Sequence, residues 1–115
     1  MRPTVTYEPW SVVVVPFPFV GRRQAKRRPA VVLSPEAFQT AHGCSVLGII
    51  TDARNPRWPS DVFLSDLEGT GLRLPSVFRS KFFTLDSALI LSRIGALSRA
   101  DRVAARRALR SALVH

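Results

Sequence analysis

The stretch KRRPAVVLS, residues 26–34, constrains the fold more than any other part of the sequence. Its second half, residues 30–33, is entirely aliphatic and offers no polar side chain to a solvent-facing side, which is typical of a buried strand. Pro29 suits the first residue of such a strand, where its missing N–H costs least. The pattern therefore places Arg28 at a strand edge and leaves the two cations before it in a loop.

Arg28 has two interpretations. A guanidinium fixed to a rigid strand can be aimed at a phosphate, because its planar set of N–H donors matches the phosphate oxygens. Lys26 and Arg27, at the end of a polar loop over residues 21–27, would then add positive charge beside it. The alternative is that these cations merely blunt a sheet edge and keep it soluble. On spacing alone the second interpretation is favoured.

Charge narrows the classes of partner. The 115 residues suffice for a single domain with a modest core, expected to span residues 1–115. The chain has 17 Lys and Arg against 8 Asp and Glu, and its net charge of +9 favours a polyanion, a negative membrane surface or an acidic protein. Fifteen of these cations are arginine, which suits phosphate and carboxylate recognition better than simple solubility.

Cysteine and hydropathy patterns narrow the protein class further. A single Cys44 rules out an internal disulfide, and one cysteine with two histidines cannot form a zinc site. No apolar run approaches the roughly 20 residues of a membrane span, and the first residues lack the pattern of a signal peptide. We therefore expect a soluble cytoplasmic protein with no metal and no other cofactor.

Short apolar runs separated by turns predict several strands. Residues 12–15 and 46–51 are largely continuous apolar runs, whereas residues 61–67 alternate as a half-buried strand should. Further strands are expected over residues 75–83 and around Ile94. About six short strands suggest a mainly β fold (α+β), a small barrel whose closure removes the exposed edges.

Two helices complete the expected fold. A short one begins at Pro35 and ends at Gly43, and a longer one begins at a capping box formed by Ser98 and Asp101. The longer helix has an apolar face that should pack on the barrel. Its opposite face carries arginines and is best explained as a solvated surface, with an RNA-binding ridge as the alternative. The apolar face contains Ala104, Ala105, Ala108, Leu109, Ala112 and Leu113, and the other Arg99, Arg106, Arg107 and Arg110.

Familiar catalytic patterns are missing from the sequence. It has no glycine-rich phosphate loop, no metal-ligand cluster and no G-x-S-x-G motif, and His42 is best explained as a surface residue. Arginines, hydroxyl groups and strand ends remain. These suit attack by a ribose 2′-OH on the adjacent phosphate, because the nucleophile then belongs to the substrate and the protein need only position it and stabilise charge. A hydroxyl such as that of Thr51 could hydrogen-bond the phosphate or the ribose.

Several motifs occur in an order that resembles a known family. WSVVVVPFPF, KRRPAVVLS, GIIT, GLRLPSVFR, FTLD and IGALSRAD together resemble the MazF/PemK toxins of bacterial type II toxin–antitoxin systems, over roughly residues 8–113. The resemblance implies an SH3-like β-barrel with short helices and a homodimer. It also implies a metal-independent endoribonuclease that cuts single-stranded RNA, and an antitoxin whose acidic, disordered tail occupies the RNA groove.

The resemblance also assigns residues. Arg28 matches the catalytic arginine of the family's R-P motif, and Thr51 matches the Thr or Ser of its I-T motif. Arg79 matches an arginine used by the plasmid-borne branch, but Lys81 stands where that branch has an aspartate, so a different acid–base scheme is expected here. Residues expected to bind RNA are Lys26, Arg27, Arg54, Arg79 and Trp58, the last by stacking on a base.

A second departure lies at the start of the first strand. Most members have Gly-Asp there, whereas this chain has Trp10-Ser11, which is expected to alter the turn or nearby hydrogen bonds. Two other functions therefore remain open. One is a non-enzymatic, gyrase-inhibitor-like binding module, because the same barrel carries that function elsewhere. The other is a degenerate paralogue that binds antitoxin without cutting RNA. The sequence does not determine a cleavage motif.

Overall fold

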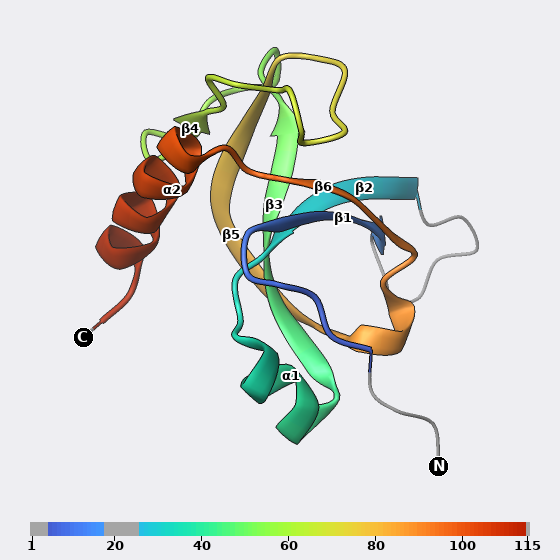
Figure 1. Cartoon of the computed structure of the whole chain (residues 1–115). Helices are drawn as coiled ribbons and strands as arrows, with labels where there is room; N and C mark the ends of the chain where they lie inside the picture. Colours follow the sequence, from blue (N-terminus) through green and yellow to red (C-terminus); the bar gives the residue numbers. More distant parts are fainter. Residues whose placement is uncertain (1–4, 18–25, 115) are drawn as a thin grey trace.

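The strands form one curled antiparallel sheet with a helix near each of two ends (Figure 1). The computed structural model describes residues 5–17 and 26–114. In these residues no helix is both long and apolar enough to cross a membrane. The sheet order is β4-β5-β3-β2-β1-β6, which confirms a mainly β fold with a C-terminal helix. The elements are β1 (Ser11–Phe17), β2 (Lys26–Val32), α1 (Glu36–His42), β3 (Cys44–Asp52), β4 (Val62–Phe63), β5 (Ser76–Asp86), a 3₁₀ turn (Ser87–Leu89), β6 (Ser92–Ala96) and α2 (Arg99–Ala112).

Both faces of the central strands are covered, which explains the apolar runs without alternation. Val12 and Val13 are neighbours on β1, their side chains point to opposite faces, and both are fully buried. One cluster packs beneath α2 and the other fills the opposite side of the curl. The first comprises Val12, Val31, Ile50, Leu64, Phe78, Leu97 and Ala105, and the second Val13, Val15, Ala30, Val32, Leu47, Leu85 and Ile90.

Strand β2 begins earlier than the sequence indicated. The prediction that Lys26 and Arg27 belong to a loop is wrong, because β1 continues to Phe17 and supplies partners for both residues. Pro29 is therefore the fourth residue of β2. It is tolerated because pairing with β3 begins only at the next residue. The rest of the expected loop, residues 21–25, lies outside the described residues.

The alternating segment over residues 61–67 forms much less strand than expected. Its alternation is confirmed by burial, since Leu64 is buried and Phe63 is 53% exposed. Only β4 is a strand, however, because the chain then bends away toward α2. There Ser65 donates hydrogen bonds from its N–H (3.0 Å) and its Oγ (2.8 Å) to the carboxylate of Asp101. These bonds replace a continued strand ladder.

The sheet is a half-barrel and not the fully closed barrel that the sequence suggested. In the described residues, the edge strands β4 and β6 do not pair with each other. The turn after β4 bridges them instead, because Ala96 of β6 donates its N–H to the carbonyl oxygen of Gly69 at 2.9 Å. Gly95 lies so close to the Gly69 carbonyl that a Cβ there would clash with it. A glycine is thus required where the turn meets the edge strand.

Helix α2 starts at the predicted cap but uses its acid differently. Ser98 Oγ accepts a hydrogen bond from the N–H of Asp101 at 3.2 Å, as a capping box requires. The Asp101 carboxylate is buried and faces Ser65 and the N–H of Asp66. Burial alone would raise the pKa of Asp101, but hydrogen bonds from these two residues outweigh it and hold the pKa below its usual value. Asp101 therefore ties the helix to the chain after β4.

The turn before β1 keeps a conformation that glycine adopts most readily. Trp10 has a φ of 72°, in the left-handed region that side chains usually avoid. Its N–H donates to Val32 at 2.7 Å, its carbonyl accepts from Leu97 at 3.0 Å, and the Arg106 guanidinium lies 5.5 Å from the centroid of its ring. The next residue, Ser11, is buried and accepts a hydrogen bond from Arg93 at 3.0 Å. These contacts hold the strained backbone in place.

Candidate functional site

Strand register brings Arg28 and Thr51 together. Ala30 of β2 lies opposite Ile49 of β3 in an antiparallel pair. Continuing this register by two residues places Arg28 opposite Thr51. Residues two apart on a strand share a face, so both side chains lie on one side of the sheet. Both residues line the same two hollows, and Ile50 is the only other described residue to do so.

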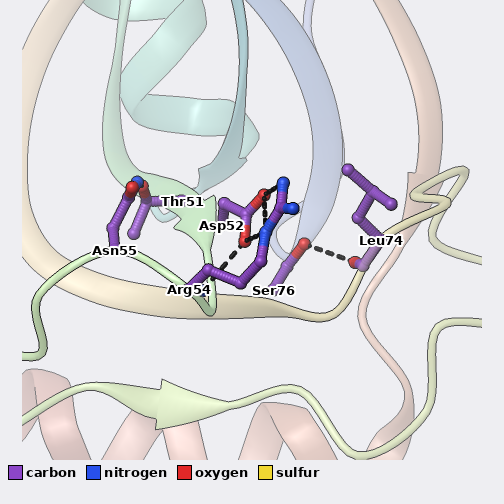
Figure 2. Close-up of polar contacts among 6 residues, drawn as sticks. All are labelled: Thr51, Asp52, Arg54, Asn55, Leu74 and Ser76. Atoms are coloured by element: carbon purple, nitrogen blue, oxygen red, sulfur yellow. Dashed lines mark hydrogen bonds and ion pairs between the residues drawn. The ribbon is translucent and has the colours of Figure 1, made fainter.

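The smaller hollow has a volume of about 190 Å³ and lies on the face that carries Arg28 and Thr51. Thr51 is fixed by the loop after β3, since its Oγ1 accepts a hydrogen bond from Asn55 Nδ2 at 2.7 Å (Figure 2). The lining residues come from β1, β2, β3, β5 and that loop. They are Phe17, Arg28, Ile49, Ile50, Thr51, Asn55, Arg79 and Lys81.

The larger hollow has a volume of about 440 Å³ and combines an apolar floor with charged residues. Its apolar residues are Val14, Pro29, Ile50, Leu72, Leu74 and Ile94. Around them lie three arginines, Arg27, Arg28 and Arg73, and one acid, Asp52. An apolar floor beneath cationic donors suits the flat ring and the phosphate of a nucleotide.

Asp52 places a negative charge in this cationic surrounding, and Arg54 offsets it (Figure 2). Its carboxylate accepts hydrogen bonds from the N–H of Arg54 at 2.8 Å and from Nη2 at 2.7 Å. Hydrogen bonds from Arg54 lower the pKa of Asp52 to about 2. Asp52 is therefore ionised at neutral pH, while the Arg54 side chain remains 83% exposed. The pair is a surface ion pair at the rim of the larger hollow.

A second ion pair holds the loop between β3 and β4, residues 53–61, against β5. Arg79 donates from Nε (3.0 Å) and Nη2 (2.9 Å) to the carboxylate of Asp61, and from Nη2 to the carbonyl of Pro56 at 2.8 Å. Its guanidinium also lies 4.9 Å from the centroid of the Trp58 ring. Hydrogen bonds from Arg79 lower the pKa of Asp61, and those to Asp61 raise the pKa of Arg79. Both groups therefore stay charged around neutral pH.

The structure separates the residues that the sequence singled out. Arg28 and Thr51 lie together, and Arg27 lines the larger hollow. Arg79 lines the smaller hollow, but its donors engage Asp61 and Pro56, so its contact with RNA stays a prediction. The other three expected RNA contacts, Lys26, Arg54 and Trp58, line neither hollow, and Trp58 is 42% exposed.

Sequence reasoning missed three residues of the hollows. Asn55 follows Thr51 by four positions, and the Asn-Pro pair that it begins is a turn signal that could have placed it beside β3. Arg73 lies in GLRLPSVFR, a motif used for the resemblance, but it comes from the turn before β5 and had no strand to fix it. Asp52 was assigned to a loop, although it is the last residue of β3.

The described residues contain no group of three or more His, Cys, Asp or Glu side chains that could hold a metal ion. Activity without a metal or other cofactor stays a prediction. The site instead offers guanidinium groups, one positioned hydroxyl and two hollows. Such groups can bind a phosphate and stabilise charge that develops on it.

Comparison with known proteins identifies the family. A model of the "PemK-like, MazF-like toxin of type II toxin-antitoxin system" matches residues 8–113. No curated protein matches the chain at a significant level. Three solved structures have its fold. MazF from Deinococcus radiodurans is 24% identical with a TM-score of 0.72, covering 94% of this chain and 96% of that one. A MazE–MazF complex from the same organism is 23% identical with a TM-score of 0.70, covering 94% and 95%.

The third is an endoribonuclease from a mycobacterial species, 15% identical with a TM-score of 0.74, covering 96% of this chain and 94% of that one. At these identities the solved structures establish the fold. The family model establishes more, because it spans nearly all of the described residues. The chain belongs to the PemK-like, MazF-like toxins of type II toxin–antitoxin systems.

Proposed function

We propose that this protein is a toxin that cleaves single-stranded mRNA in the cytoplasm, without a metal, by attack of a ribose 2′-OH on the adjacent phosphate. The observation that carries the proposal is the meeting of Arg28 and Thr51 at the boundary of two hollows. A phosphate bound there would leave room for one nucleoside in each hollow. Arg28 would stabilise the charge of the phosphorane and take part in proton transfer, and Thr51 would hydrogen-bond a phosphate oxygen.

The remaining contacts would then position the strand. Arg27 and Arg73 lie in the larger hollow with Arg28, where they could bind phosphates on either side of the cleaved one. Lys26 extends this cationic row along β2. Trp58 and Arg54, in the loop over residues 53–61, are exposed and could contact a base or phosphate beyond the hollows.

The test is incubation of the purified protein with a long single-stranded RNA in EDTA. We expect cleavage at a short recurring sequence, with fragments that end in a 2′,3′-cyclic phosphate and begin with a 5′-hydroxyl. Mass spectrometry of the fragments identifies both ends. Cleavage that requires a divalent ion, or fragments with 5′-phosphates, would overturn the mechanism. Intact RNA combined with inhibition of gyrase would favour the binding-module alternative instead.

Partners follow from the same surface. The net charge of +9 and the arginines of the larger hollow suit an acidic antitoxin segment that competes with RNA. One solved relative is a MazE–MazF complex, which supports an antitoxin as the partner. We also propose a homodimer. Light scattering at micromolar concentration should give twice the chain mass of 12.8 kDa, and a monomeric mass would contradict it.

Replacing Asp52 by asparagine should tighten RNA binding. The change removes a negative charge beside the phosphate site and releases Arg54, which can then pair with a phosphate. With a non-cleavable RNA, we expect Kd to fall roughly fivefold at low salt, and the slope of log K against log salt to steepen by about 0.7. Glu36→Gln, on α1 at the other end of β3, is the matched control and should leave Kd unchanged. Equal Kd values for Asp52→Asn and the wild type would contradict the prediction.

A further inference from the structure

We infer that Asn55 is a positioning residue that turns the Thr51 hydroxyl into a hydrogen-bond donor toward the cleaved phosphate. The inference rests on the proposed function and adds a residue to it. Asn55 lies in the loop after β3, and its Nδ2 is 2.7 Å from Thr51 Oγ1 (Figure 2). Both residues line the smaller hollow together with Arg28.

The direction of this hydrogen bond decides where the Thr51 proton points. An amide nitrogen carries only donor hydrogens, so the Thr51 oxygen accepts from Asn55. The single proton of the hydroxyl must then seek another acceptor. In the described part of the chain, Thr51 Oγ1 has no second hydrogen-bond partner. A phosphate oxygen is purely an acceptor, so a phosphate beside Arg28 would complete the arrangement.

Asn55 is held in place by contacts on both sides. Its own N–H donates to the carbonyl of Asp52 at 3.0 Å, which closes the turn at the end of β3. The carbonyl of the next residue, Pro56, accepts from Arg79 Nη2 at 2.8 Å. Arg79 is in turn fixed by Asp61, whose side chain is fully buried. The charged pair on β5 thus anchors the loop one residue beyond Asn55, and we assign Arg79 to this anchoring role.

A double-mutant cycle tests the inference. Cleavage is measured under single-turnover conditions at saturating protein for the wild type, Asn55→Ala, Thr51→Val and the double variant. We expect Asn55→Ala to lower the rate about five- to tenfold, the equivalent of one hydrogen bond, with little change in affinity. Thr51→Val should lower it at least as much. Adding Asn55→Ala to Thr51→Val should have no further effect, because Asn55 acts only through the lost hydroxyl.

Two further variants sharpen the result. Ser60→Ala truncates another polar residue of the same loop and should cleave at the wild-type rate. Asn55→Asp is close in size but offers only acceptor oxygens, so it would draw the Thr51 proton away from the phosphate. It should therefore be slower than Asn55→Ala. Circular dichroism and thermal unfolding confirm that each variant is folded.

The outcomes separate this inference from the proposed function. Independent, multiplicative effects of Asn55→Ala and Thr51→Val would show that Asn55 acts on RNA directly or only supports the loop. A change confined to affinity, or wild-type cleavage by Asn55→Ala, would also overturn the positioning role while leaving the nuclease intact. Failure of the wild-type protein to cleave RNA at all would overturn the proposed function, and the inference with it.

Discussion

Replacing Arg28 by alanine should abolish RNA cleavage while leaving the half-barrel folded. The side chain is exposed, so its loss leaves no cavity in the core. It lies opposite Thr51 and lines both hollows, where its guanidinium can contact the phosphate throughout the reaction. Loss of a donor that stabilises charge in the transition state typically costs a factor of about 10² to 10³ in rate. We expect at least that reduction, measured as the single-turnover rate on a mapped RNA site.

Two control variants define what the loss means. Arg28→Lys keeps the charge but loses the paired donors of the guanidinium, so it should recover RNA binding and little of the rate. Arg107→Ala removes an exposed arginine from α2, away from both hollows, and should cleave normally. Wild-type cleavage by Arg28→Ala, with an unchanged circular dichroism spectrum, would remove Arg28 from the mechanism.

The second large effect is expected from the substrate and not from the protein. An RNA with a single 2′-deoxy sugar, directly before the cleaved phosphate, lacks the nucleophile of the proposed reaction. Its phosphates are intact, so contacts with Arg28 and Arg27 should persist and binding should be retained. We expect no cleavage at that position. Fluorescence anisotropy measures the binding, and gel electrophoresis measures the cut.

The matched control moves the 2′-deoxy sugar to the nucleotide after the cleaved phosphate. That RNA should be cut, because the attacking hydroxyl is still present. If both RNAs are cut at the normal rate, the nucleophile is not the 2′-OH, and Arg28 and Thr51 need other roles. If neither is bound, the 2′-OH contributes to recognition and not only to chemistry.

Sequence patterns predicted the parts of the fold that depend on burial and on local caps. Apolar runs located the strands, Gly43 ended the first helix and Ser98 started the last. They failed where a distant partner decides the outcome. Lys26 is in a strand because β1 reaches it, and residues 61–67 leave the sheet because Asp101 binds that segment. Neither partner is near in sequence, so no local pattern could reveal it.

The candidate site divides in the same way. The motifs that carry the resemblance pointed to Arg28 and Thr51, and the β2–β3 register then accounts for their meeting. The role of Arg79 was harder to foresee, because an arginine motif does not say whether the guanidinium is free. Here Asp61, 18 positions earlier, engages it. Asn55 was missed because its contact with Thr51 depends on the exact path of the loop.

The pairing of β1 with β6 has a consequence for how the protein is made. Val12 near the start of the chain lies opposite Gly95 near its end, and Ser11 lies opposite Ala96. On the ribosome, β1 therefore lacks one neighbour until almost the whole sheet has been synthesised. Such long-range pairing is slow, because a long loop must close before the contact forms. An incomplete nascent chain would thus leave apolar residues of β1 uncovered, and the groove between β2 and β3 would be finished only late in synthesis.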